Sequence, residues 1–67
     1  MRIISKSRTH FYGTHKGHTI NIEKESDGTF YIIVKDERGS YAYDGWAPND
    51  VRTMAQAKRE AIRGACL

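Results

Sequence analysis

The stretch TFYIIVKDERGSYAYDGW, residues 29–46, is the densest run of large apolar side chains in the chain, and it decides the fold. Residues 29–36 are rich in aromatic and β-branched types, which favour strands. Residues 36–39, DERG, are polar and end in glycine, a pattern typical of a type I turn whose last position is left-handed. A second aromatic run follows, so the stretch predicts a β-hairpin.

The turns fix which residues lie opposite one another. Counting back from Asp36 opposite Ser40 predicts three further pairs: Val34 with Ala42, Ile32 with Asp44 and Phe30 with Trp46. A similar turn at residues 26–28, SDG, predicts the pairs of the preceding hairpin: Glu25 with Thr29, Ile22 with Ile32 and Ile20 with Val34. The two hairpins share the strand that begins at Thr29.

Side chains alternate between two faces along a strand, so this register sorts them into two sets. One set is apolar and is expected to face the core: Ile20, Ile22, Phe30, Ile32, Val34, Ala42 and Trp46. Asp44 also falls on this side, near its rim. The other set is polar but contains three tyrosines and an isoleucine: Asn21, Glu23, Tyr31, Ile33, Lys35, Tyr41 and Tyr43.

The flanking segments complete the expected fold. Residues 1–8 are predicted to be a short edge strand or a loose arm, and residues 9–14 and 18–24 are predicted strands around a turn at Gly17. Thr53 and Gln56 have the spacing of a capping box, which predicts a helix over residues 53–64 ended by a left-handed Gly64. Its inner side is expected to hold Met54, Ala57, Ala61, Ile62 and Ala65. The expected fold class is α+β: a single domain, residues 1–67, with an antiparallel β-meander of three to four strands and one C-terminal α-helix packed on one face.

The length of 67 residues leaves room for one small core, and a homodimer would cover additional apolar surface. The single cysteine, Cys66, excludes an intrachain disulfide and favours a reducing, cytoplasmic setting. The chain has no apolar run near the ~20 residues of a membrane span, and its start lacks the hydrophobic core of a signal peptide. We therefore expect a cytoplasmic protein without a membrane segment.

The sequence offers no catalytic motif and no cofactor motif. Three histidines, His10, His15 and His18, lie near one predicted hairpin, but with Cys66 they lack the tight paired spacing of a zinc site. No nucleophile elbow and no glycine-rich phosphate loop is present. We expect no catalytic residue, no metal site and no cofactor.

The polar side of the sheet is the best functional candidate, because tyrosine buries a large area in interfaces and keeps a polar tip. The expected partner-binding residues are Tyr31, Ile33, Lys35, Arg38, Tyr41 and Tyr43. Three other occupants of this side remain open: the N-terminal segment with Phe11 or Tyr12, a second copy of the chain, or nucleic acid. In the nucleic-acid alternative, phosphates would meet a basic set made of Arg2, Lys6, Arg8, Lys16 and Lys35.

The chain has a net charge of +3, and its charges are unevenly distributed along the sequence. Residues 1–18 carry four bases and no acid, whereas residues 19–50 are acidic and residues 51–67 are basic again. A basic chain attracts polyanions, but here the segment that builds the sheet is acidic. This distribution favours a protein partner over nucleic acid.

The segment from Gly28 onward resembles the N-terminal module of HicB-like antitoxins. The matching residues are Asp27-Gly28-Thr29-Phe30-Tyr31 and, on the helix, Thr53, Ala57, Ala61 and Ile62. Residues 35–39, KDERG, stand where that family has Pro-Asp-Leu-Pro-Gly. The resemblance implies a sheet-plus-helix binder of the kind carried by phages and plasmids. We expect a non-enzymatic protein-binding module, a regulator or inhibitor encoded by a mobile element, with a small nucleic-acid-binding protein as the alternative.

Overall fold

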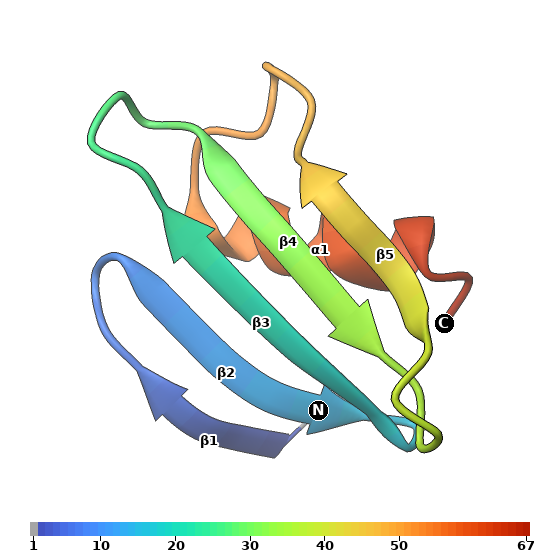
Figure 1. Ribbon diagram of the computed structural model, residues 1–67. Helices are drawn as coiled ribbons and strands as arrows, with labels where there is room; N and C mark the ends of the chain where they lie inside the picture. The colour runs from blue at the N-terminus through green and yellow to red at the C-terminus, as the bar shows by residue number, and fades with distance from the viewer. Residues whose placement is uncertain (1) are drawn as a thin grey trace.

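The computed structural model describes residues 2–67 as one antiparallel sheet with a single helix across one face (Figure 1). The sheet order is β1-β2-β3-β4-β5, so each strand pairs with its neighbours in sequence. The elements are β1 (Arg2–Lys6), β2 (His10–His15), β3 (His18–Lys24), β4 (Phe30–Lys35), β5 (Tyr41–Trp46) and α1 (Met54–Gly64). The expected α+β class and the meander are confirmed.

The strand number differs from the expected three to four, because the sheet has five strands. The segment left open as an edge strand or a loose arm is an edge strand, β1, with Arg2 opposite Thr14 and Lys6 opposite Phe11. Met1, part of that expectation, lies outside the described residues. An exposed strand such as β1 is hard to identify from sequence, because no face of it is buried.

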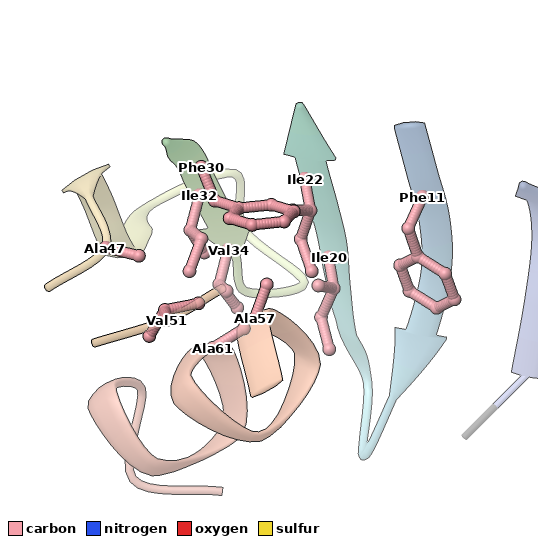
Figure 2. Packing of buried hydrophobic residues seen from close by; sticks show 10 residues of the cluster. All are labelled: Phe11, Ile20, Ile22, Phe30, Ile32, Val34, Ala47, Val51, Ala57 and Ala61. Atoms are coloured by element: carbon pink, nitrogen blue, oxygen red, sulfur yellow. The ribbon is translucent and has the colours of Figure 1, made fainter. Parts of the chain in front are cut away.

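The core lies between α1 and the central strands β3 and β4 (Figure 2). The fully buried sheet residues Ile20, Ile22, Ile32 and Val34 come from these two strands, and they form the predicted apolar side. Helix residues Ala57 and Ala61 face them and are also 0% exposed. Their small side chains let the helix backbone approach the sheet closely, so most of the core volume is supplied by the strands.

Phe11 extends this core onto β2, beyond the reach of the helix backbone. The Nζ of Lys58 lies 4.9 Å from the centre of the Phe11 ring, and Phe11 is fully buried. The aliphatic stem of a lysine can cover apolar surface while its ammonium group stays in water. The lysine therefore extends the cover that α1 gives to the sheet.

The turns form as the sequence predicts. Glu25 N–H donates to Thr29 O (2.8 Å), and Asp36 N–H donates to Ser40 O (2.9 Å). Gly28 and Gly39 have positive φ, as Gly17 does in the β2–β3 turn. The predicted pairs Ile22–Ile32 and Ile20–Val34 are confirmed.

The predicted register of β5 is wrong, because this strand contains a bulge at Ala42. Lys35 lies opposite Tyr41, but Val34 lies opposite Tyr43 rather than Ala42. One extra residue moves every later side chain of the strand to the other face. Asp44 thus lies opposite Ile33 instead of Ile32, and Trp46 opposite Tyr31 instead of Phe30.

The bulge exchanges the two faces of β5 in a way that suits its residues. Trp46 was expected in the core but lies on the side away from α1, where it is 58% exposed. Ala42 is exposed as well, whereas Tyr43 is half-buried against the core cluster. The shift also removes the carboxylate of Asp44 from the apolar side, where an unpaired charge would be costly to bury.

Tyr43 is held by the last turns of α1. Its hydroxyl donates to Glu60 Oε2 (2.9 Å), and Arg63 donates two bonds to Glu60 Oε1, at 2.7 Å from Nη2 and 3.0 Å from Nε. Burial and then the bond to Glu60 raise the pKa of Tyr43. The bonds from Arg63, with the one from Tyr43 adding to them, lower the pKa of Glu60.

The two ends of α1 differ in how well they follow the prediction. Thr53 caps the helix, and its side chain and that of Gln56 form the predicted capping box. At the other end Gly64 is still helical, and the residue with positive φ is Cys66. Gly64 serves a different purpose, because a Cβ at this position would collide with the ring of Tyr43.

The contact between Gly64 and Tyr43 yields the first prediction. Gly64→Ala should lower the free energy of unfolding by about 1–3 kcal/mol, the usual cost of overpacking. In a Tyr43→Ala background the same change should instead stabilise the helix by up to about 1 kcal/mol, because alanine is the better helix former. Denaturant unfolding of the four proteins measures both values. Equal effects in the two backgrounds would contradict the placement of Tyr43 against the helix.

Candidate partner-binding face

The open face is the side of the sheet turned away from α1. The pairing of the strands aligns its side chains in rows that cross the sheet. One row is His10, Glu23, Tyr31 and Trp46; the next is Tyr12, Asn21, Ile33 and Asp44; the third is Thr14, Thr19, Lys35 and Tyr41. Among residues 2–67 no element packs over this face, since α1 contacts the sheet from the other side.

The aromatic pair of Tyr31 and Trp46 occupies one corner of the open face. Their ring centres are 4.9 Å apart and the ring planes meet at 81°, an edge-to-face arrangement. The Tyr31 hydroxyl donates to Asp44 Oδ1 at 2.7 Å. The contact and the hydrogen bond together fix the orientation of Tyr31, so a large aromatic surface is presented without much conformational freedom.

A shallow hollow of about 260 Å³ lies in the middle of the open face. Its walls are Tyr12, Thr19, Asn21, Ile33 and Lys35, which come from three adjacent strands. Its floor is partly apolar through Ile33 and its rim carries amide, hydroxyl and ammonium groups. Such a depression suits a single side chain of a partner better than a small-molecule substrate, whose sites bury most of the ligand.

Polar contacts bound the hollow on both sides. His10 Nε2 lies 3.0 Å from Asn21 Oδ1 and 3.6 Å from a Glu23 carboxylate oxygen. On the opposite side the Lys35 ammonium lies 5.1 Å from the centre of the Tyr41 ring, within cation–π range. The polar groups near the hollow are therefore already oriented.

The predicted partner-binding residues divide into three groups. Tyr31, Ile33, Lys35 and Tyr41 lie on the open face, as expected. Arg38 lies in the β4–β5 turn, where its backbone N–H donates to Asp36 Oδ1 (2.8 Å). Tyr43 lies on the helix side, so its assignment to the polar side of the sheet is wrong.

Sequence reasoning missed two aromatic residues of the open face, Trp46 and Tyr12. Trp46 was expected on the core side, because nothing in the sequence indicates the bulge in β5 that turns it to the open face. Tyr12 belongs to the segment that one of the alternatives above folds over this face, but β2 is a strand of the sheet itself, so Phe11 points into the core and Tyr12 points to the open face. The alternation of these two neighbours within a strand was the signal that could have placed both.

The basic residues of the nucleic-acid alternative are not gathered on one surface. Arg2 and Lys35 belong to the same row of the sheet, since Arg2 lies opposite Thr14. Lys6 lies opposite the buried Phe11 and thus on the helix side, and Arg8 is in the β1–β2 turn. Lys16 is in the β2–β3 turn, where its ammonium donates to Leu67 O (3.0 Å).

Residues 2–67 contain no cluster of three or more metal-ligating side chains. His10 is engaged by Asn21 and Glu23, and the Nδ1 of His18 lies 3.0 Å from Lys16 O. The described part of the chain also has no helix with the length and apolar character needed to cross a membrane. Comparison with protein-family models, with curated proteins and with solved structures finds no match.

The hydrogen bond between Tyr31 and Asp44 gives a pH prediction. The bond to the Asp44 carboxylate, followed by burial, raises the pKa of Tyr31. A raised pKa in the folded state means that this contribution to stability is complete below the usual tyrosine pKa of about 10 and is lost as pH rises through the folded value. We expect Asp44→Asn to bring the pKa of Tyr31 back toward the usual value.

Ultraviolet absorbance of the phenolate, followed against pH, measures this change. Because the pKa of Tyr43 is also raised, Tyr31→Phe identifies which part of the late-titrating signal belongs to Tyr31. A titration that Asp44→Asn leaves unaltered would show that the carboxylate does not control Tyr31.

Proposed function

We propose that the chain is a non-enzymatic protein-binding module that recognises its partner through the open face. The observation that carries this proposal is the half-exposed aromatic surface of Tyr31 and Trp46, fixed beside a shallow hollow. Tyrosine and tryptophan dominate the energetic centres of protein interfaces. The anchors of the proposed contact are Trp46, Tyr31, Tyr12 and Tyr41.

The charge on the open face supports a protein partner over nucleic acid. Its bases, Arg2 and Lys35, are matched by the acids Glu23 and Asp44. A surface that binds nucleic acid gains most of its affinity from an excess of Lys and Arg near the phosphates. A face with balanced charge and a large aromatic surface has the composition of a protein interface.

The partner's contribution follows from the same features. The hollow would take one medium-sized side chain, and the aromatic pair would lie against an apolar patch next to it. Because Ile33 is only half-buried in the floor of the hollow, an aliphatic side chain entering there would displace water from apolar surface. A second copy of the chain could present such a surface, and the experiment below distinguishes that homodimer from a different partner.

We place this module among regulators or inhibitors encoded by mobile elements, and the support is the HicB-like pattern alone. Asp27-Gly28 forms the β3–β4 turn, Thr53 caps α1, and Ala57 and Ala61 pack in the core. These residues act in folding here, so the pattern supports the kind of scaffold. A partner must be found by experiment.

The test is affinity capture from the source cells with matched variants. The wild-type chain should retain a protein after nuclease treatment, and Tyr31→Ser with Trp46→Ser should lose it. Because the two rings lie outside the core, the double variant should stay folded. Its free energy of unfolding should be lower than that of the wild type by about 1–2 kcal/mol, which is the expected contribution of the ring pair and the surface that it buries. Arg59→Ser, an exposed change on the helix side, should retain the same protein.

Three results would overturn the proposal in different ways. Capture that survives the Tyr31 and Trp46 changes would place the binding surface elsewhere. Loss of the captured material on nuclease treatment would favour nucleic acid. Sedimentation of the purified wild-type chain as a dimer that the same two changes dissociate would make the open face a homodimer contact.

A further inference from the structure

The outer edge of β1 is an unpaired strand edge. In the described sheet β1 pairs only with β2, so its other side is open (Figure 1). All five residues of β1 are exposed, and its two isoleucines, Ile3 and Ile4, are 48% and 55% exposed. An open edge offers backbone N–H and C=O groups that can pair with an additional strand.

One of these groups can be placed from the hairpin. Ser7 N–H donates to His10 O at 2.8 Å, which makes Ser7 and His10 a hydrogen-bonded pair. Hydrogen-bonded and non-hydrogen-bonded pairs alternate along an antiparallel ladder. The next pair, Lys6 with Phe11, is therefore non-hydrogen-bonded, and the N–H of Lys6 points to the open edge.

The charge of this edge selects what can pair with it. Arg2, Lys6 and Arg8 lie along β1 and its turn, and residues 2–18 contain no aspartate or glutamate. In the open edge these positive charges have no carboxylate beside them on the same strand. An approaching strand that carries acidic side chains would gain Coulomb energy, whereas a basic strand would be repelled.

The same charges discourage pairing with another copy of the chain. Two antiparallel β1 strands would bring Arg2, Lys6 and Arg8 of one copy close to the same three bases of the other copy, and this repulsion between like charges opposes pairing. Both edge strands carry a register shift, between Ile3 and Ser5 in β1 and at Ala42 in β5, so an added strand would pair with the regular part of β1 that follows the shift and contains Lys6. The positive charge of the β1 edge therefore opposes self-association, whereas it attracts a strand of opposite charge.

We propose that the β1 edge is a second interaction surface, which receives an extended acidic segment of a partner protein as a sixth strand. Backbone hydrogen bonds would supply part of the affinity, and Ile3 and Ile4 would cover alternate apolar side chains of the added strand. Arg2, Lys6 and Arg8 would select for aspartate and glutamate. This surface is separate from the open face and does not depend on the function proposed for it.

The probe is a synthetic peptide of alternating valine and glutamate with blocked termini, and the control probe replaces each glutamate by lysine. The acidic peptide should slow hydrogen exchange of the Lys6 amide and bind more weakly as salt increases, while the basic peptide should do neither. Trp46 is the only tryptophan and lies on the open face, so its fluorescence should stay unchanged. Trp46→Ser should bind the peptide like the wild type.

Two variants at one position separate backbone pairing from charge. Lys6→Gln removes the charge but keeps the N–H, and we expect about a threefold loss of affinity, typical of one exposed ion pair. Lys6→Pro removes the charge and the outward N–H, and we expect a loss of about tenfold or more. Proline is tolerated at an edge position whose N–H faces solvent, and circular dichroism of the variant checks that the fold is kept.

Several outcomes would overturn this proposal. Equal binding by the two Lys6 variants would mean that charge alone attracts the peptide. Displacement of the peptide by duplex DNA at physiological salt would make the edge a general polyanion site. Self-association of the wild type that Lys6→Pro abolishes would identify a second copy as the occupant. If Lys6→Pro fails to fold, an unprotected Lys6 amide in the wild-type complex is sufficient to reject strand addition.

Discussion

The burial of β3 and β4 beneath two alanines of α1 is the constraint on which the remaining structure depends. Ile20, Ile22, Ile32 and Val34 fill the space, and Ala57 and Ala61 let the helix lie close enough to exclude water from all four. The helix contacts β3, β4 and β5. The rest of the five-stranded sheet must be stabilised in other ways. Lys58 extends over Phe11, and β1 is left with no apolar cover at all.

This constraint accounts for the accessibility of the two surfaces that we propose for binding. The sheet has one helix for two faces, so one face stays accessible, and it is the one that collects aromatic side chains. The sheet is also wider than the helix, so the strand farthest from the core has an accessible edge. A domain of this size cannot bury every face of a five-stranded sheet, and the surface left over is available for recognition.

The sequence was sufficient for the parts of the fold that local rules determine. The glycine turns, the register of β3 with β4 and the capped helix all follow from positions such as Gly28, Gly39 and Thr53. It was insufficient at Ala42, because nothing in the residue type marks a bulge, and the choice depends on where Tyr43 and Asp44 fit in three dimensions. For the same reason the predicted assignment of side chains to the open face is correct on β3 and β4 but wrong for Tyr43 and Trp46 on β5. The conflict of Asp44 with the apolar side was the one visible sign of the error.

The left-handed Cys66 at the end of α1 has a practical consequence. It is an exposed, free thiol and the single cysteine of the chain, and it lies two residues after the end of α1, the helix that covers the side of the sheet opposite the open face. A maleimide linker attached there would orient the protein on a sensor surface with its aromatic side toward the solution. The chain thus carries its own site for directed immobilisation, without any engineered residue.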